Sequence, residues 1–531
     1  MPKQDARSTS GSGLSTDRHR YISTTLHIVG TSVVAVSLGM LACGVLEVFT
    51  TNTDTVALLL SGMGALILGD LLRRYTSLSE IRSRRVFAAV AWTWITTILI
   101  GSFPFILAGT FAAPGVDFLE QVVNSVFESA SGFSCTGSTA LADFTPGKGL
   151  GKGLLMYRQA TQWYGGMGVV ILAVAVLPFL GVGGLELIAA EAPGPSSDRL
   201  TPRVRETARR LWGIYIGLTI IAVLALFIIA GLSFYDSVAH ALTVVSTGGF
   251  SPYASSIGHF DSVGVEVVLI VLMILGGANF SLHWWSLKGR TLLHWRDSEF
   301  RTYLGMLLLA ATAVVGLLRF SGGFTWDSAL RVGVFNVVSL GTSTGFSNAT
   351  HPGSVGDYVT WLAGGQLVLV FLMLVGGCTG STAGGIKIMR MQILGVVTVR
   401  SLHLIQRPRS IILVRLGRSV IPENVVFRVI GFCFMHIILL VLGLLLVTAL
   451  GGNFETTLGA VVSALGNMGP ALGEAGPTNS FSSVFSQPAR LVLASLMIIG
   501  RLEIMSVLLM VALLMPKPGF WVRSRKRILR I

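Results

Sequence analysis

The sequence predicts an all-α integral membrane protein in which four similar helix–loop–helix units follow two extra transmembrane helices. Of the 531 residues, 52% are hydrophobic and 12% are charged, which is about half the charged fraction of a soluble domain. The apolar stretches have the length of a spanning helix, about 20 residues, and lack the short alternating segments of an outer-membrane barrel. A short stretch that ends in glycine also occurs four times between such helices.

Positive charge is concentrated in segments that can all face one side of the membrane. The formal net charge is +14, and 32 of the 39 Lys and Arg residues lie in the N-terminal tail and in five further segments. These segments are 73–85, 181–210, 286–301, 387–428 and 515–531. Lys and Arg are retained in cytoplasmic loops, so the bias predicts that both termini are cytoplasmic and argues against a nucleic-acid partner.

Two apolar runs, 27–49 and 54–72, open the chain as a pair of spanning helices, and no cleavable signal peptide precedes them. The repeated pattern then gives paired helices at 86–108 and 158–180, at 210–232 and 264–285, at 302–320 and from about 359, and at 425–450 and 489–514. These limits divide the chain into a cytoplasmic tail (1–26), a two-helix leader (27–85) and four repeats (86–209, 210–301, 302–424 and 425–531), the last including the basic C-terminal tail.

The four glycine-ended stretches share a register. The first reads FESASGFSCTGST and contains Gly137, and the others end at Gly248, Gly345 and Gly469. Successive glycines are 111, 97 and 124 residues apart, a loose period typical of one duplicated unit. Serine lies six residues before the glycine in three units, whereas the second unit has Leu242 there. We interpret the four stretches as one repeated feature rather than as ordinary extracellular turns.

These stretches are too short to cross a membrane, which predicts re-entrant segments. Non-helical backbone is tolerated at membrane depth only where it is buried in protein or lines a watery cavity. Four loops that face one another around an axis meet this condition, because their carbonyl oxygens can coordinate a dehydrated cation. Glycine permits the backbone angles that such a loop needs, and the helix before the loop directs its negative end towards the ion. The sequence therefore predicts a cation filter around one central pore.

The sequence resembles the TrkH type of the Trk/Ktr/HKT superfamily of potassium transporters over nearly the whole chain. Besides the four loops, the resemblance rests on QWYGGMGVVILAVAVLP (162–178), AEAPGP (190–195), GGCTGSTAGGIKIMR (376–390) and GRLEIMSVLLM (500–510). It implies a transporter of the bacterial inner (plasma) membrane rather than an enzyme, with potassium as its substrate and no bound organic cofactor. It also implies a homodimer and a cytosolic, TrkA-like nucleotide-binding regulatory subunit.

The resemblance also implies which residues form the potassium filter. They are Ser134, Cys135, Thr136 and Gly137; Val245, Ser246, Thr247 and Gly248; Thr342, Ser343, Thr344 and Gly345; and Gly466, Asn467, Met468 and Gly469. Serine at the first glycine is associated with sodium preference in plant relatives, so glycine at all four positions favours potassium. Cys135 replaces an expected threonine or other small polar residue, but its backbone carbonyl serves equally.

The second helix of the third unit is interrupted by ten residues, five of them glycine, each of which costs a helix interior about 1 kcal/mol. They are Gly376, Gly377, Cys378, Thr379, Gly380, Ser381, Thr382, Ala383, Gly384 and Gly385. The interruption is either a packing break or a polar loop that obstructs the pore below the filter, and we favour the loop. The family resemblance implies that it is the gate. We assign Lys387 to the gate as well and, with Arg390, to the cytoplasmic boundary.

Arg501 is a lone cation within the predicted helix 489–514. Facing lipid would cost at least about 2.5 kcal/mol, and Glu503 lies at a spacing that points to a different helix face. We therefore expect Arg501 to face the pore or a partner on another unit. The family resemblance implies a place beneath the filter beside the gate, where its charge would repel cations. The alternative is a purely structural buried ion pair.

Three other functions are compatible with parts of the sequence. An ion-selecting subunit of an ATP-driven potassium pump carries four such loops, but the 376–390 and 500–510 motifs and the leader fit the TrkH type better. A secondary cation carrier predicts inverted repeats and paired acids at mid-membrane, whereas these repeats are parallel. A membrane enzyme is disfavoured because the histidines are scattered and no HExxH motif occurs.

Two further features have plain interpretations. Cys43 and Cys433 are expected to be small buried thiols, since the four cysteines show neither zinc spacing nor a disulfide framework. The basic segment 387–428 can contact anionic membrane lipid or a regulatory partner. Its position directly after the proposed gate favours the partner.

Overall fold

The computed structural model describes residues 10–77, 83–147, 149–180, 200–289, 293–417 and 419–503. The AEAPGP motif and the basic C-terminal tail lie outside these residues, as does the predicted helix beyond residue 503. The described chain is helical apart from short turns and two pairs of two-residue strands. These are β1 (Thr145–Pro146) parallel to β2 (Gly149–Leu150), and β3 (Arg415–Leu416) antiparallel to β4 (Ser419–Val420).

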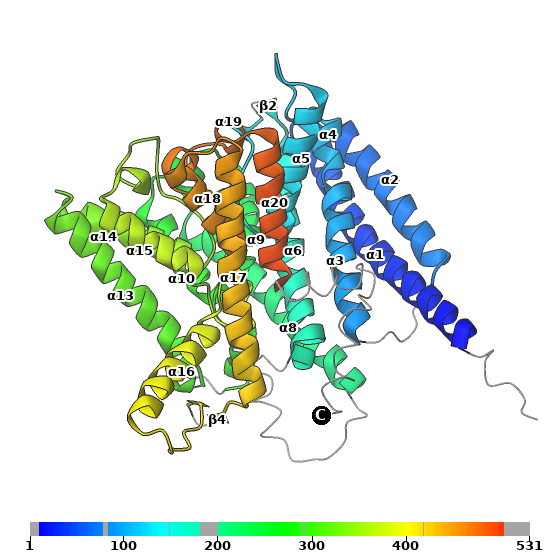
Figure 1. Ribbon diagram of the computed structural model, residues 1–531. Helices are drawn as coiled ribbons and strands as arrows, with labels where there is room; N and C mark the ends of the chain where they lie inside the picture. Colours follow the sequence, from blue (N-terminus) through cyan, green and yellow to red (C-terminus); the bar gives the residue numbers. More distant parts are fainter. Residues whose placement is uncertain are drawn as a thin grey trace, which may run out of the picture.

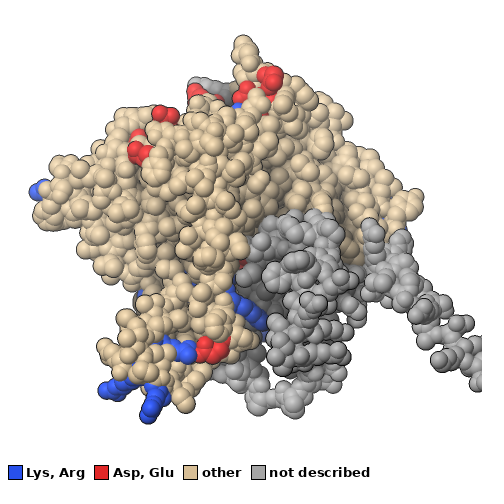
Figure 2. All heavy atoms as spheres, viewed as in Figure 1, with Lys and Arg blue, Asp and Glu red and all other residues tan. Residues whose placement is uncertain are grey.

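Seven helices of the described part are long and apolar enough to cross a membrane, and a bent helix pair would make an eighth. Figure 2 shows an uncharged band across the middle of the visible face. Most of the visible Asp and Glu side chains lie near its upper end, and most of the visible Lys and Arg side chains near its lower end. The prediction of an all-α multi-pass membrane protein is confirmed.

The leader forms a hairpin of α1 (Ser10–Val48) and α2 (Thr55–Arg74) at one side of the molecule (Figure 1). Small residues let the two helices approach closely, since a Cβ atom on Gly30 would lie 2.8 Å from the carbonyl oxygen of Gly69. The buried carboxylate of Glu47, near the end of α1, accepts hydrogen bonds from the Thr51 hydroxyl (2.5 Å) and from the backbone N–H of Gly153. This fastens the leader to the start of the fourth helix of the first unit, α6.

A long helix, a shorter helix and a second long helix follow in each of four units. The first contains α3 (Ser83–Gly101), α4 (Phe103–Leu107), α5 (Phe118–Phe133) and α6 (Lys152–Leu180). The second contains α8 (Leu200–Leu224) with a π-helical end (Ala225–Ile229), α9 (Phe234–Val245), α10 (Val263–Gly276) and α11 (Phe280–Leu287). The short α12 (Leu293–Arg296) leads to the third.

The third unit contains α13 (Ser298–Phe320), α14 (Trp326–Gly341), α15 (Ala363–Leu374) and α16 (Ile388–Gln406). The fourth contains α17 (Glu423–Ala449), α18 (Phe454–Gly466), the short α19 (Phe481–Val484) and α20 (Gln487–Arg501). We call α5, α9, α14 and α18 the central helices. They have 12 to 16 residues, too few to span a membrane, and lie largely buried among the longer helices (Figure 1).

The four units pack in a closed order. The second long helix of each unit packs against the central helix of the next: α6 against α9, α10 against α14, α15 against α18, and α20 back against α5. Capping side chains fix where three of the central helices begin, because Asp117, Ser233 and Thr325 accept hydrogen bonds from the first-turn N–H groups of α5, α9 and α14. The closed order brings the C-terminal ends of all four central helices together in the interior.

Two of the second long helices are interrupted. The third unit breaks between α15 and α16, where the sequence predicted a break. The second unit, predicted as one helix over 264–285, breaks as well, because α10 and α11 meet at an angle of 99°. Gly276 and Gly277 weaken the helix here, and the Asn279 side chain accepts a hydrogen bond from the Ser281 N–H (2.9 Å) that starts a new one.

Candidate functional site

The chain leaves each central helix through a loop with the same backbone geometry. Two residues of every loop, separated by one position, have positive φ. The pairs are Cys135 and Gly137, Thr247 and Gly249, Ser343 and Gly345, and Asn467 and Gly469, with φ between +50° and +98°. Positive φ is uncommon outside glycine and costs free energy, so four recurrences mark a backbone shape that the fold imposes.

The second loop is shifted by one residue from its predicted alignment. In each loop one backbone N–H donates to a carbonyl five residues earlier; the pairs are Thr136 to Ser131, Gly248 to Thr243, Thr344 to Ser339, and Met468 to Ser463. Gly249, rather than Gly248, therefore matches the other three glycines, and Val245 is the last residue of α9. With this shift Thr243 replaces the mismatched Leu242, so all four units carry a hydroxyl residue there.

The four loops form a closed ring, which comprises residues 134–137, 246–249, 342–345 and 466–469. A Cβ atom on the glycine of each loop would meet a backbone carbonyl oxygen of the next loop. The pairs are Gly137 with Gly248, Gly249 with Thr344, Gly345 with Met468, and Gly469 with Thr136. A side chain at any of these glycines would therefore collide with backbone. The loops after the ring line a partly open cavity of about 50 Å³, whose lining includes Gly137, Gly249, Gly345 and Pro470.

Several carbonyl oxygens of the ring have no protein partner. Within the described chain, no hydrogen-bond donor reaches the carbonyl oxygens of Thr136, Thr344 or Met468. The equivalent oxygen of Gly248 accepts a bond from the Gln162 side-chain amide (2.6 Å). Buried carbonyls are rarely left unpaired, and a cation that has lost its water would satisfy them.

Residues 375–387, called here the inner segment, pack directly against the ring. A parallel bridge between Val375 and Ile386 closes the base of the segment. The Thr382 hydroxyl donates to the carbonyl of Val245 (3.0 Å) and accepts from the Thr247 hydroxyl (3.2 Å). The N–H of Gly384 donates to the Ser343 hydroxyl at 2.6 Å.

Glycine is required where the inner segment approaches the fourth loop. A Cβ atom on Gly384 would collide with the carbonyl oxygen of Gly466. The segment also fills the break in the second unit, since the Cys378 N–H donates to the Gly277 carbonyl (2.9 Å) and the Phe280 N–H to the Gly380 carbonyl (3.2 Å). It therefore contacts the second, third and fourth units.

Arg501 is buried, with 3% of its surface exposed, and it connects the inner segment with the first loop. Its Nη1 donates to the carbonyl of Thr382 (2.6 Å), and its Nη2 donates to the Sγ of Cys135 (3.0 Å). The structure thus brings Arg501 together with the predicted filter and the predicted gate. Its partners are a carbonyl and a thiol, whereas Glu503 points elsewhere and pairs with Arg390 (2.6 Å).

Lys387 and Arg390, which the sequence places at the cytoplasmic boundary, are both buried within the protein. The Lys387 ammonium donates to the carbonyl of Ala383 within the inner segment. The Arg390 guanidinium lies 3.9 Å from the ring centroid of Phe432 and pairs with Glu503. Hydrogen bonding inside the inner segment and an ion pair between units hold these two cations away from solvent.

Sequence reasoning missed Glu299, a buried residue of α13. Its carboxylate accepts hydrogen bonds from the N–H of Thr379 (2.6 Å) and the N–H of Met389 (3.1 Å), one in the inner segment and one just after it. The only sequence signal was an acid in the first turn of a spanning helix, which also suits an ordinary cap. Gln162 lies in the motif at 162–178, but the sequence did not indicate what its side chain would contact.

Other candidate residues are packed. All four cysteines are free and buried, which confirms the prediction for Cys43 and Cys433. His240 lies in a central helix between the carbonyl of Asp236 (2.8 Å) and the hydroxyl of Ser251 (3.0 Å). Within the described ranges, no three His, Cys, Asp or Glu side chains are grouped so that they could hold a metal ion.

Comparison with known proteins extends over most of the chain. Residues 57–523 match the TrkH family of cation transport proteins. The Trk system potassium uptake protein TrkH of Salmonella typhimurium is 33% identical over 503 residues, which cover 93% of this chain and 98% of that protein. The protein of the same name from Halomonas elongata is 36% identical over 447 residues, covering 83% and 87%. The crystal structure of the potassium transporter TrkH from Vibrio parahaemolyticus matches with a TM-score of 0.81 and 30% identity, covering 94% and 99%.

Proposed function

The chain belongs to the TrkH family of cation transport proteins, and on this premise we propose that it takes up potassium through the ring of four loops. Membership confirms the resemblance that the motifs indicated and makes the chain a Trk-type potassium uptake transporter rather than an enzyme. The observation that carries the proposal is the closure of the ring, in which unpaired carbonyl oxygens from three loops lie between contacting glycines. Potassium is the substrate, and no organic cofactor is needed for this function.

Selectivity comes from the ring backbone. In the corrected alignment the filter consists of the predicted residues of the first, third and fourth loops together with Ser246, Thr247, Gly248 and Gly249 of the second. Each of the four glycines packs against a carbonyl group of the next loop, so the ring has little freedom to contract. A potassium-sized set of oxygens is thereby favoured over the smaller set that sodium requires.

The inner segment is proposed as the gate. It lies against three of the four units on the side of α16, where positive charge is concentrated in Figure 2, so an ion that passes the ring from outside meets it next. Arg501 adds a fixed positive charge at the contact between the segment and the first loop. Cations are repelled from this position, so permeation depends on whether the segment and Arg501 move away together.

Regulation is proposed to come from a cytosolic, TrkA-like nucleotide-binding subunit, and the protein is proposed to act as a homodimer in the bacterial inner membrane. The position of α16 in the chain supports a partner at this helix. The helix begins directly after the inner segment and leads to the β3–β4 hairpin. A partner that displaces α16 would pull directly on the gate. Membrane lipid surrounds the spanning helices.

Potassium flux in proteoliposomes tests this function. The purified protein is reconstituted, and potassium and sodium fluxes down equal gradients are measured with and without ATP and with and without the cytosolic subunit. We expect potassium flux that exceeds sodium flux and needs no ATP hydrolysis by a pump subunit. Flux that appears only with a co-purifying P-type ATPase would support the pump alternative, and absence of potassium flux in every combination would overturn the proposal.

A further inference from the structure

The central helices carry different residues at one equivalent position. It lies nine residues before the last glycine of each ring loop, which is Gly137, Gly249, Gly345 or Gly469. These residues are Glu128, His240, Asn336 and Ala460, and all four are buried. Three of them are polar, although they lie in the interior of a membrane protein, where a polar side chain without a partner is costly. Each of the three therefore needs a partner, and each finds at least one beyond the ring.

Each polar side chain bonds the chain two or three residues after its ring glycine. Glu128 accepts from the N–H of Ala140 (2.8 Å) and from the hydroxyl of Thr139 (3.0 Å). The equivalent bonds join His240 to the Ser251 hydroxyl at 3.0 Å and Asn336 to the Asn348 side chain at 2.9 Å. The central helix thus supports the outer end of its own loop in three units, and Ala460 offers no such bond in the fourth.

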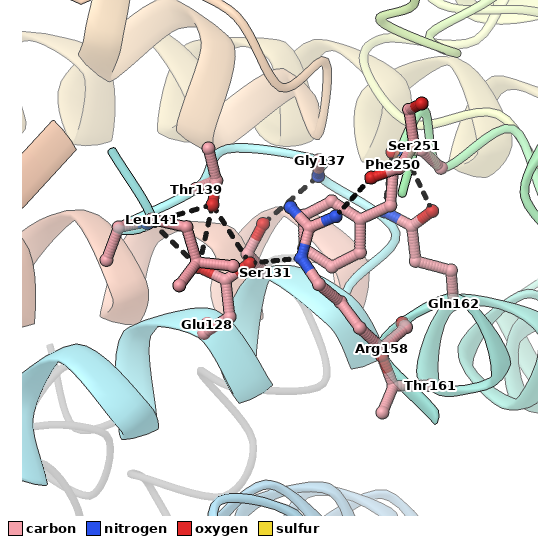
Figure 3. A network of polar contacts seen from close by, with 12 residues as sticks. Glu128, Ser131, Gly137, Thr139, Leu141, Arg158, Thr161, Gln162, Phe250 and Ser251 are labelled. Atoms are coloured by element: carbon pink, nitrogen blue, oxygen red, sulfur yellow. Dashed lines mark hydrogen bonds and ion pairs between the residues drawn. The ribbon is translucent and has the colours of Figure 1, made fainter. Parts of the chain in front are cut away.

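The support in the first unit is charged. Glu128 pairs with Arg158 of α6, with 2.5 Å between Oε1 and Nε, and both side chains are at most 2% exposed. The other end of the guanidinium donates to the carbonyl of Ser251 (2.9 Å), and its centre lies 3.4 Å from the ring centroid of Phe250. Figure 3 shows the pair pointing towards each other between Thr139 on one side and Phe250 and Ser251 on the other. One ion pair therefore joins the outer ends of two neighbouring loops.

A second residue of α6 strengthens this connection. Gln162 lies one turn after Arg158, on the same face of the helix. Its side-chain amide donates to the carbonyl of Gly248 (2.6 Å), and its oxygen accepts from the N–H of Phe250 (3.0 Å). The second loop is held at three points, Gly248, Phe250 and Ser251, from the same helix that holds Glu128.

We propose that Glu128, held by Arg158, is a positioning residue that fixes the spacing of the first two ring loops and thereby sets the preference for potassium over sodium. The inference rests on the proposed function of the ring. Charge-assisted hydrogen bonds are shorter and stronger than neutral ones, so this support is stiffer than those of His240 and Asn336. Without it the first loop can move towards the axis, where its oxygens coordinate a smaller ion.

The test is the ratio of potassium to sodium flux in proteoliposomes of the full-length protein, for Glu128→Gln against Glu120→Gln. Both residues lie in α5 and pair with an arginine, but Glu120 pairs with Arg490 of α20 and does not contact the ring. We expect the ratio to fall about tenfold in Glu128→Gln and to stay within about twofold of wild type in the control. The ratio, unlike total flux, does not change when less protein folds.

A milder variant covers the case in which Glu128→Gln leaves Arg158 unpaired and prevents folding. Thr139→Val keeps the shape of the side chain but removes the hydroxyl that donates to Glu128. Its ratio is expected to fall about threefold, whereas Thr312→Val on α13, whose hydroxyl bonds only its own helix, should not change it. Wild-type ratios in the Glu128 and Thr139 variants would overturn this inference alone. A wild-type protein without potassium preference would overturn the proposed function and the inference with it.

Discussion

The ring and the inner segment are both non-helical backbone in the interior of a membrane protein, yet they are fixed in different ways. The ring closes on itself through four equivalent contacts, each a glycine against a neighbouring carbonyl. The inner segment has one such contact with the ring, Gly384 against the carbonyl of Gly466, and is otherwise held by single hydrogen bonds that all differ, among them those of the Thr382 hydroxyl, the Ser343 hydroxyl and the Arg501 guanidinium. Single hydrogen bonds contribute only about 1 kcal/mol each and can be exchanged, whereas a steric contact between backbones cannot. The proposed function requires this difference, because it needs a ring that keeps its shape and a segment that moves.

The largest effect is expected from Gly345→Ser, which breaks the ring. The new Cβ atom would collide with the carbonyl oxygen of Met468, and φ of +82° adds strain. Strain of about 1–3 kcal/mol at one loop should lower the ratio of potassium to sodium flux about 5- to 150-fold, chiefly by admitting sodium. Ion fluxes in proteoliposomes measure this ratio.

Gly323→Ser is the matched control for the ring. Gly323 lies in the same unit with φ of +74°, but a Cβ atom there would meet only open space. It imposes the backbone strain without the collision, so its flux ratio should equal that of wild type. Equal ratios in both variants would mean that close packing of the ring is not what selects the ion.

Arg501→Ala is expected to have the next largest effect and acts on the inner segment. The partners of Arg501 are a carbonyl and a thiol, so its removal leaves no buried carboxylate unpaired and the protein should fold. Loss of a nearby positive charge worth about 1 kcal/mol should raise potassium flux about fivefold and leave the potassium-to-sodium ratio unchanged.

Arg331→Ala controls for loss of an arginine. Arg331 pairs with Asp261 and Glu266 between the second and third units and does not contact the inner segment. Its potassium flux per folded protein should match that of wild type. If both variants behave alike, or if Arg501→Ala leaves flux unchanged, the charge beneath the ring is not a barrier.

The inner segment and the ring also differ in how far the sequence could predict them. The glycine-rich interruption at 376–385 and the isolated charge of Arg501 can both be recognised in the sequence alone. The structure brings these two regions together. The alignment of the second loop is not visible in the same way. Gly248 and Gly249 are adjacent, and threonine before the first of them imitates the other loops; the shared letters GFS at 249–251 and 345–347 were the available clue.

Contacts between distant residues explain the remaining errors. The break after Gly276 depends on the inner segment, about a hundred residues away, whose Cys378 N–H bonds the Gly277 carbonyl in place of the lost helical partner. The pair of Glu128 with Arg158 likewise depends on how α5 and α6 fold back on each other. Periodicity and composition report local propensity, and they do not contain these pairings.

A smaller effect is expected from Thr382→Val, which keeps the shape of the inner segment but removes one of its fastenings to the ring. The lost hydroxyl bonds the Val245 carbonyl and the Thr247 hydroxyl. Weakening this contact should favour displacement of the segment and raise potassium flux about threefold. Thr398→Val on α16, whose hydroxyl bonds only its own helix, is the control. A flux below that of wild type would show that this hydroxyl serves the open state instead.

The smallest effect is expected from Cys135→Ser, at a ring residue whose side chain accepts a hydrogen bond from Arg501. A hydroxyl can still accept from Nη2 of Arg501 and donate to the Gln162 carbonyl, and the backbone carbonyl of residue 135 is unchanged. The potassium-to-sodium ratio should stay within about twofold of wild type, as it should in Cys433→Ser, which changes a buried thiol of α17 outside the ring.

Cys135→Ala removes the acceptor and should raise potassium flux, as Arg501→Ala is expected to do. A changed ratio in Cys135→Ser would mean that the side chain itself takes part in ion selection, and the separation between a rigid selecting ring and a movable inner segment would then fail at this residue.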